Sequence, residues 1–269
     1  MTPLVKIRGA MIAFDRSGEG PTFVWGHGLT SSRAGEDQLA MIDWTVLRSK
    51  ADVVRYDARG HGESSLTGDL DAYGWDELAG DQLGLCDELG IQRAVFGGAS
   101  MGAATALHAA VLAPDRVSAL VLVIPPTAWE TRAGQVDLYR QMADVIEAAG
   151  PEPVITAGAD VPSPDPFVPA PGEVDEWKGR RAVTLRTTEP ERLARIFRGA
   201  AQADFPTREA ISAISCPTLI LAWSGDPGHP VSSAEQLHDL IGGSSLSVAS
   251  TKGELATWTG RVADFVSNR

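Results

Sequence analysis

The sequence predicts an α/β fold in which a doubly wound, mostly parallel sheet carries an inserted helical cap. Short apolar segments bounded by glycines alternate with segments of helical spacing along most of the chain, which is typical of repeated strand–helix units. One stretch, residues 126–206, interrupts this alternation and contains no clear strand. We therefore expect residues 1–125 and 207–269 to form the core domain and residues 126–206 to form the cap.

The expected strands are mostly continuous apolar runs. Such runs are typical of central strands in a parallel sheet that helices cover on both faces. The first two strands, residues 4–7 and 10–14, are expected to form a short hairpin, and a turn at residues 17–21 is expected to follow it. The strands are expected at residues 4–7, 10–14, 22–25, 52–56, 94–96, 117–124, 217–223 and 246–249.

The expected helices have apolar residues at helical spacing. In the core they are expected at residues 75–89, 101–112 and about 254–266, where the last has Leu255, Trp258, Val262 and Phe265 on one face. In the cap, residues 138–149 and 189–201 have a helical pattern, and a proline-rich connection separates them. A structureless loop of that length is improbable in a compact domain, which favours the interpretation as a cap.

Composition excludes several classes of partner. The chain has 269 residues, 43% of them hydrophobic, and a formal net charge of −12. Without a cluster of basic residues, this charge argues against binding nucleic acid or an anionic membrane, and we interpret it as a solvated acidic surface. The longest apolar stretch, residues 117–126, is too short to span a bilayer, and the first eleven residues do not resemble a signal peptide. We expect a cytoplasmic protein; the sequence does not indicate its oligomeric state.

The two cysteines are interpreted as thiols. Cys86 lies in an expected helix and Cys216 beside an expected strand, and we expect both to be buried rather than joined in a disulfide. No group of residues has metal-ligand spacing. The glycine-rich stretch 97–103 lacks the lysine of a phosphate-binding loop and the spacing of a dinucleotide-binding loop. The sequence therefore implies neither a metal nor a cofactor.

The strongest chemical signal is the segment Gly98-Ala99-Ser100-Met101-Gly102, which follows an expected strand and begins an expected helix. This context is that of a nucleophile elbow, a sharp turn that exposes a serine hydroxyl above the edge of the sheet. Ser100 would also lie at a helix N-terminus, where partial positive charge favours an anion. We therefore identify Ser100 as the candidate nucleophile.

Three further segments match the pattern of the α/β-hydrolase fold superfamily, and the chain resembles this superfamily over essentially its whole length. The segments are residues 27–29 after the third expected strand, residues 56–64 after the fourth, and residues 223–226 at the end of a later strand. The resemblance implies that the backbone N–H groups of Leu29 and Met101 form the oxyanion hole. It also implies that Asp226 is the catalytic acid, although the residues around Asp226 also suit a simple turn.

The chain departs from the family pattern at the histidine. The family order is serine, acid, histidine, and the histidine is expected near residues 250–254, where none occurs. His229, in the loop that follows Asp226, lies at the sheet edge expected to carry Ser100, where ligands bind in open α/β sheets. We consider His229 a candidate general base; it could instead be a loop residue or a substrate contact.

Other residues compete for the same roles. Lys252 and His61 are alternative bases, and Asp57 or Glu130 could orient His229 in place of Asp226. The remaining histidines are less suitable. His27 belongs to a structural motif, His108 points away along its helix, and His238 lies on an expected exposed helix.

The leading hypothesis is a serine hydrolase that acts on a small ester, lactone or thioester, with an apolar substrate. Trp129, Phe167 and Trp177 of the cap are expected either to line the substrate pocket or to form the core of the cap. The missing histidine motivates a second hypothesis, a hydrolase-fold protein that binds a small ligand or catalyses an elimination or isomerisation without hydrolysis. A third hypothesis is an interaction module that uses the cap as a docking surface.

Overall fold

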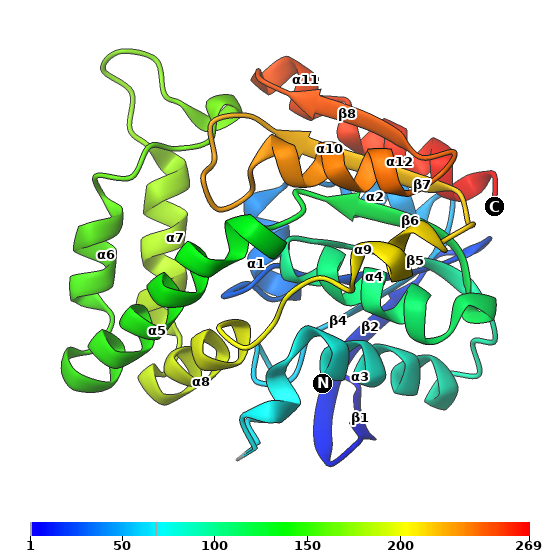
Figure 1. Cartoon of the computed structure of the whole chain (residues 1–269), viewed down its shortest axis with the longest axis horizontal. Helices are drawn as coiled ribbons and strands as arrows, with labels where there is room; N and C mark the ends of the chain where they lie inside the picture. The colour runs from blue at the N-terminus through cyan, green and yellow to red at the C-terminus, as the bar shows by residue number, and fades with distance from the viewer. Residues whose placement is uncertain (1, 68) are drawn as a thin grey trace.

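The computed structural model describes residues 2–67 and 69–269, with one eight-stranded sheet at the centre (Figure 1). The expected strands all form, although several extend one to three residues beyond the predicted ends. Their bounds are β1 Leu4–Ile7, β2 Ala10–Ser17, β3 Thr22–Gly26, β4 Asp52–Tyr56, β5 Ala94–Ala99, β6 Val117–Val123, β7 Thr218–Trp223 and β8 Ser245–Ala249. The predicted α/β fold class is confirmed.

The order of the strands brings the chemistry to one edge of the sheet. The order is β1-β2-β4-β3-β5-β6-β7-β8; β1 and β2 are antiparallel, as are β2 and β4, and the other pairs are parallel. The carboxyl ends of β3 to β8 therefore point the same way. Leu29, Ser100 and Asp226 all follow the carboxyl ends of strands at this edge.

Helices connect the strands and cover the sheet. The α-helices are α1 Arg33–Leu39, α2 Trp44–Arg48, α3 Trp75–Glu88, α4 Met101–Leu112, α5 Arg132–Ala149, α6 Glu152–Gly158, α7 Glu176–Thr187, α8 Pro190–Ala200, α9 Arg208–Ser212, α10 Val231–Leu240, α11 Lys252–Ala256 and α12 Trp258–Ser267. Four short 3₁₀ helices are η1 Asp71–Tyr73, η2 Pro114–Arg116, η3 Trp129–Thr131 and η4 Asp165–Phe167.

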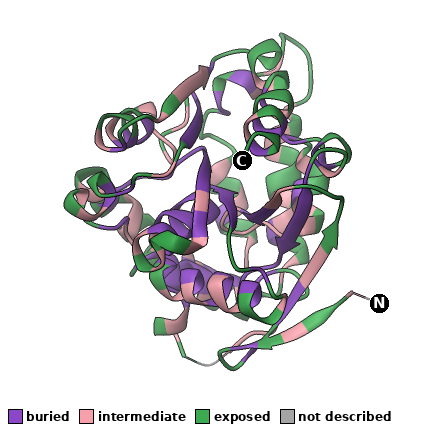
Figure 2. Cartoon of the chain, turned by 90° about the vertical axis from the view of Figure 1, so that its right-hand side faces the viewer, coloured by how far each residue is buried: buried purple, intermediate pink, exposed green. Residues whose placement is uncertain are grey.

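Alternate residues of each central strand pack on opposite faces of the sheet. In β6, Leu120 and Leu122 join the core formed with α3, α4 and α10, whereas Val121 and Val123 join the core formed with α2 and α12. This follows from the two-residue period of side chains in a strand. Figure 2 shows the buried residues concentrated in the strands and on the inner sides of the helices. The central strands are thus buried on both faces, as their continuous apolar runs predict.

The segment between β6 and β7 is helical. In Figure 1 the helices α5 to α8 gather at the left of the molecule, beside the sheet. They share a small apolar core that includes Ile146, Leu185, Ile196 and Phe197. The proline-rich connection is more ordered than expected, because α6 and α7 lie within it and Pro151 and Pro153 fall at the start of α6. Proline is tolerated in a first helical turn, where the N–H groups have no partner in the helix. The boundaries at residues 126 and 206 stay a prediction.

The expectation of a single C-terminal helix is wrong. The chain forms two helices, α11 and α12, which meet at Thr257. Thr251 and Glu254 form a capping box that starts α11, and the Thr257 hydroxyl donates to the Glu254 carbonyl where α11 ends. Side-chain hydrogen bonds of this kind offer the backbone an alternative to continuing the helix. The apolar spacing spans both helices, which is why it suggests one.

Both cysteines are free thiols, but only Cys86 is buried; Cys216 is partly exposed. Across residues 2–67 and 69–269, no helix is long and apolar enough to span a bilayer.

Candidate active site

Ser100 lies in a strained turn between β5 and α4. Its backbone has φ 53° and ψ −111°, a combination that residues with a side chain rarely adopt. The turn is held because the Ser100 N–H donates to the Val123 carbonyl at 2.9 Å, and the Ser100 carbonyl accepts from Ala104 N–H in the first turn of α4. This is the geometry of a nucleophile elbow, and the Ser100 side chain lies at the N-terminus of α4.

Three glycines allow the elbow to pack against β3. A methyl group on Gly102 would overlap the carbonyl oxygen of Gly26, and one on Gly98 would overlap Gly102 and the same oxygen. The backbones of β3, β5 and α4 can therefore approach more closely than side chains would permit. This close approach brings the loop after β3 next to Ser100.

His229 lies beside Ser100. Its Nε2 is 2.7 Å from Ser100 Oγ, and its Nδ1 is 2.7 Å from Asp226 Oδ2. Both distances are within hydrogen-bonding range. The structure thus brings together the three residues that the sequence singles out, with the imidazole between the hydroxyl and the carboxylate.

Asp226 accepts hydrogen bonds from three groups. Trp223 Nε1 donates to Oδ2 at 2.9 Å, Gly228 N–H donates to Oδ1 at 2.9 Å, and His229 contacts Oδ2. Burial by itself raises the pKa of Asp226, but His229 and these donors outweigh it and lower the pKa to about 2. Asp226 is therefore an anion at neutral pH, hydrogen-bonded to the Nδ1 edge of the His229 ring.

The loop that carries His229 is fixed at both ends. His229 N–H donates to the Asp226 carbonyl at 3.2 Å, which forms a tight turn. Thr127 N–H, just after β6, donates to the Gly228 carbonyl at 3.2 Å, and Asp165 N–H of η4 donates to the Ser224 carbonyl at 3.0 Å. The inserted helical segment therefore contributes to the position of the loop.

The loop after β3 holds Gly28 and Leu29 against the elbow. An added Cβ on Gly28 would lie 3.6 Å from Ser100 Cβ. The Gly28 carbonyl accepts from Ser31 N–H at 3.0 Å and is 2.8 Å from His27 Nδ1. Because the peptide group is planar and trans, the N–H of Leu29 points away from these partners. Met101 N–H is in the first position of α4, where helix geometry leaves it free for another acceptor.

His27 and His61 have structural contacts. His27 Nε2 accepts from the N–H of Ala58, so its Nδ1 carries the proton that is donated to Gly28. His61 Nδ1 lies 2.9 Å from the Arg59 carbonyl, and burial lowers the pKa of His61 to about 3. Both rings are buried and neutral at physiological pH, and neither lies between Ser100 and a carboxylate.

The other two histidines are also held elsewhere. His108 Nε2 is 2.9 Å from the Asp204 carbonyl, on the far side of α4 from the elbow turn. His238 is exposed on α10, and its Nδ1 is 2.8 Å from Ser244 Oγ. Both positions agree with the expectation from helical spacing.

The alternative carboxylates have partners away from His229, and the alternative base Lys252 is exposed. Lys252 is in the first turn of α11. Glu130 forms an exposed ion pair with Arg208, which lowers the pKa of Glu130. Asp57 is buried, where it accepts from the backbone N–H groups of Arg33 and Glu63. The structure therefore brings Asp226, and neither of the two alternatives, to His229.

Phe167 and Trp177 pack against the core on one face of the sheet, not in the apolar core that α5 to α8 share. Their rings stack at 4.6 Å, and each packs edge-on against Trp223, whose ring lies 6.1 Å from the His229 ring. Phe167 and Trp177 are partly exposed. Trp129 packs elsewhere: its ring lies edge-on to that of Phe205, in the core on the opposite face of the sheet.

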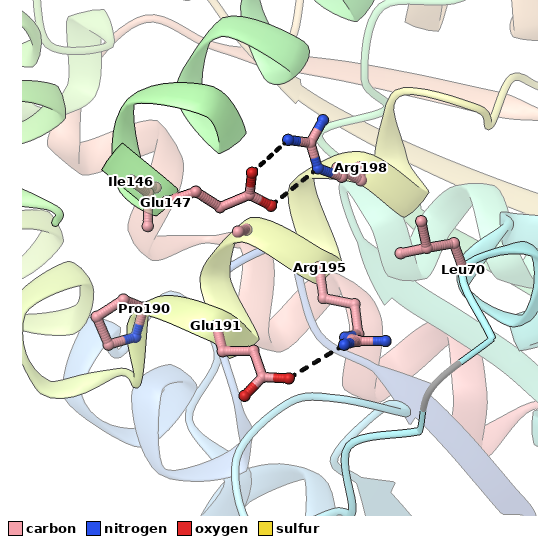
Figure 3. A pocket seen from close by; sticks show the side chains of 8 residues that line it. Leu70, Ile146, Glu147, Pro190, Glu191, Arg195 and Arg198 are labelled. Atoms are coloured by element: carbon pink, nitrogen blue, oxygen red, sulfur yellow. Dashed lines mark hydrogen bonds and ion pairs between the residues drawn. The ribbon is translucent and has the colours of Figure 1, made fainter. Parts of the chain in front are cut away.

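A separate groove of about 400 Å³ lies between α5, α8 and Leu70 (Figure 3). Two arginines in it form ion pairs: Arg198 with Glu147, and Arg195 with Glu191. None of the residues that line this groove belongs to the Ser100 site. Among the described residues, no group of three or more His, Cys, Asp or Glu side chains is arranged to hold a metal ion.

Comparison with known proteins identifies the family. The family model described as alpha/beta hydrolase fold matches residues 21–150. The 3-oxoadipate enol-lactonase 1 of Acinetobacter baylyi is 30% identical over 196 residues, which cover 73% of this chain and 69% of that protein. This chain belongs to the α/β-hydrolase family. A putative carbamate hydrolase, RutD of Klebsiella pneumoniae, is 30% identical over 212 residues, covering 75% of this chain and 73% of the relative.

Solved structures of the hydrolase family share the fold. A thermophilic esterase from Thermogutta terrifontis superposes with a TM-score of 0.79 at 24% identity, covering 99% of this chain and 97% of that chain. The enol-lactonase of Burkholderia xenovorans LB400 superposes with a TM-score of 0.76 at 23% identity, with the same coverage. At this identity the likeness concerns the fold.

Residues 250–254, where this family ordinarily has its histidine, form the start of α11 in this chain. Ser250 Oγ accepts from Ser224 Oγ at 3.0 Å, and Glu254 accepts from the N–H groups of Ser250 and Thr251. These bonds cap the N-terminus of α11. The imidazole beside Ser100 comes instead from the loop after β7.

Sequence reasoning missed two polar contacts of this site. The first is the hydrogen bond from the indole of Trp223 to Asp226. Asp226 is three residues from both Trp223 and His229, and this regular spacing was a usable signal for a loop whose side chains contact one another. The second contact is that of Glu36 with Trp25 Nε1, at 2.5 Å. An acidic residue in a first helical turn is common, so the sequence carries no signal for this contact.

Proposed function

We propose that this chain is a serine hydrolase that cleaves small carboxylic esters, lactones or thioesters through an acyl-enzyme on Ser100. The observation that carries the proposal is the 2.7 Å separation of His229 Nε2 and Ser100 Oγ. A base in hydrogen-bonding range of a serine on a nucleophile elbow is what acyl transfer requires. The lactonase and carbamate hydrolase names of its relatives support a substrate of this class.

In the proposed reaction, Ser100 Oγ attacks the carbonyl carbon and its proton passes to His229 Nε2. Asp226, held as an anion, stabilises the imidazolium and keeps Nδ1 protonated. The carbonyl oxygen becomes an oxyanion that accepts from the N–H groups of Leu29 and Met101. His229 then donates the proton to the leaving oxygen or sulfur, and the C–O or C–S bond breaks to leave the acyl-enzyme.

In the second half of the reaction, water attacks the acyl-enzyme. His229 takes a proton from this water and returns one to Ser100 Oγ as the ester bond to the enzyme breaks. The products are a carboxylic acid and the free hydroxyl of Ser100. For a lactone the leaving hydroxyl belongs to the same molecule as the acyl group, so a single hydroxy acid is released. The partly exposed Phe167 and Trp177 suit an apolar substrate.

The non-hydrolytic alternative depended on the absence of a histidine after the last strand. In the proposal His229, with its Nε2 2.7 Å from Ser100 Oγ, serves as the base, so the hydrolase does not need a histidine after the last strand. The hydrolase is therefore the function that the geometry supports best.

The test uses a fluorophosphonate probe and p-nitrophenyl acetate. We expect the parent to be labelled at Ser100 and to hydrolyse the ester, and both Ser100→Ala and His229→Ala to lose these reactions. His238→Ala, an exposed histidine on α10, is the matched control and should behave as the parent. If His229→Ala retains parental activity, the proposed base is wrong; if Ser100→Ala retains it, the proposed function itself is wrong.

A further inference from the structure

A buried carboxyl group lies behind the loop that carries Leu29. Glu36 is in the first turn of α1, the helix that begins directly after this loop, and it is only 6% exposed. Its Oε2 accepts from the indole N–H of Trp25, which is on β3 and 1% exposed. Removing a carboxyl group from water is costly unless it gains specific partners. The position of Glu36 therefore calls for an explanation beyond packing.

The hydrogen bond between Glu36 and Trp25 joins the two ends of the loop. Trp25 is on β3, just before the loop at residues 27–32, and Glu36 is in α1, just after it. Glu36 N–H also donates to the Ser32 carbonyl at 2.9 Å, at the end of the loop. The carbonyl of Gly28 accepts from Ser31 N–H at 3.0 Å. Gly28 lies against Ser100, since an added Cβ on Gly28 would be 3.6 Å from Ser100 Cβ. Because the Gly28 carbonyl and the Leu29 N–H belong to one planar peptide group, the position of the loop sets the direction of the Leu29 N–H.

The charge state of Glu36 suits a site that stabilises an oxyanion. Burial raises the pKa of Glu36 to about 8, against the opposing effects of Trp25 and Arg55, while Asp37 raises it further. A protonated carboxyl still accepts hydrogen bonds through its oxygen atoms. It can therefore hold the loop at neutral pH without placing a full negative charge behind the position where an oxyanion would develop.

We propose that Glu36 is a positioning residue of the oxyanion hole. Its hydrogen bond to Trp25 joins the start of α1 to the end of β3 and so holds in place the loop that carries the Leu29 N–H. The inference rests on the proposed function, because it assumes that Leu29 N–H faces a reacting carbonyl. It predicts that changes at Glu36 act on the rate of the chemical step more than on substrate binding. A residue that only fills the core would lower stability without this effect.

The experiment compares Glu36→Met, which fills the space without polar atoms, with Glu36→Gln, whose amide oxygen can accept the same hydrogen bonds. In variants shown to be folded by circular dichroism, kcat and KM for p-nitrophenyl acetate are measured at pH 7. We expect Glu36→Met to lower kcat about tenfold with KM within about twofold, since loss of one oxyanion donor costs about 100-fold or more and misalignment costs less. Glu36→Gln should restore kcat to within about threefold of the parent.

Two controls make the result decisive. Gln82→Ala changes a fully buried polar residue of α3, away from the loop, and should leave kcat unchanged at a temperature where it is folded. Should Glu36→Met fail to fold, Trp25→Phe removes the indole donor while keeping an aromatic ring, and should lower kcat about threefold.

Parental kcat in a folded Glu36→Met, or in a folded Trp25→Phe if the former does not fold, would overturn the inference. So would a Glu36→Gln variant as slow as Glu36→Met. Ser100→Ala, assayed beside them, separates the two proposals. If it is inactive while Glu36→Met is fully active, only the role of Glu36 is rejected; if Ser100→Ala is active, the proposed function fails first.

Discussion

The indole N–H of Trp223 donates a 2.9 Å hydrogen bond to Asp226 Oδ2, the same oxygen atom that lies 2.7 Å from His229 Nδ1. Trp223 is fully buried at the end of β7, so this bond ties the loop to the rigid sheet. The orientation of Asp226, and through it that of His229, therefore depends on a residue three positions earlier in the chain.

Trp223→Phe should lower kcat about tenfold and leave KM nearly unchanged. Phenylalanine keeps an aromatic ring against Phe167 and Trp177 but removes one donor to a carboxylate. Such bonds are worth about 1.5–3 kcal/mol. Steady-state kinetics with p-nitrophenyl acetate measure the effect. Trp258→Phe is the matched control: Trp258 stacks on Trp223, is equally buried, and its indole N–H has no partner among the described residues. Equal losses in the two variants would contradict a role for the Trp223 hydrogen bond.

Asp226→Asn should lower kcat by about a thousandfold or more, because an amide neither stabilises the imidazolium nor enforces the required tautomer. Glu130→Gln, which changes an exposed carboxylate paired with Arg208, should have parental activity. The two variants test which carboxylate, Asp226 or Glu130, orients His229. A large loss in Glu130→Gln with an active Asp226→Asn would reverse the assignment.

Gly102→Ala should destabilise the protein by at least about 2 kcal/mol and abolish activity, because the new methyl group would overlap the Gly26 carbonyl. Gly134→Ala, in the first turns of α5, has open space around its Cβ position and should stabilise the protein by up to about 1 kcal/mol. Urea denaturation measures both changes. A Gly102→Ala variant of parental stability would show that β3 and α4 are not packed as closely as described.

Asp81→Asn should cost about 3 kcal/mol or more of unfolding free energy. Asp81 and Arg59 form a buried ion pair with two hydrogen bonds, of 2.8 and 2.7 Å, and losing the carboxylate leaves a buried guanidinium uncompensated. Glu152→Gln breaks the exposed pair with Arg186 and should leave the melting temperature within error of the parent. A thermal melt in which both variants shift equally would contradict this ranking.

Glu36→Gln should change how stability depends on pH. The pKa of Glu36 is about 8 in the folded protein and 4.5 for an unperturbed glutamate, so the folded state holds a proton that the unfolded state releases between these values. The contribution is fully present below pH 4.5 and is lost as the pH rises through about 8. Glutamine does not titrate. Between pH 5 and 8.5 the free energy of unfolding of Glu36→Gln should therefore rise, relative to that of the parent, by at least about 2 kcal/mol, at about 1.4 kcal/mol per pKa unit. Urea denaturation at the two pH values tests this, and a constant difference would contradict it.

The sequence alone determined the sheet and the sharp turn that carries Ser100. Strands such as Val117–Val123 are continuous apolar runs, and Ser100 lies between a strand and a helix with a glycine two residues away on each side. These signals are local, because strand burial and turn geometry depend on neighbours in the sequence. Local signals were weaker where side chains compete with the backbone, which is why the break at Thr257 was missed.

The tertiary structure decided which imidazole meets Ser100. The sequence offered His229, His61 and Lys252 as bases. It left Asp226, Asp57 and Glu130 as possible partners of the base. Ser100 and His229 are 129 positions apart in the sequence. They meet because β5 and β7 end at the same edge of the sheet, with only β6 between them. A distance between side chains from separate strands depends on the whole packed core, and no local pattern encodes it. The buried contact of Glu36 with Trp25 has the same origin, since it joins a helix to a strand and leaves no mark in the spacing of either.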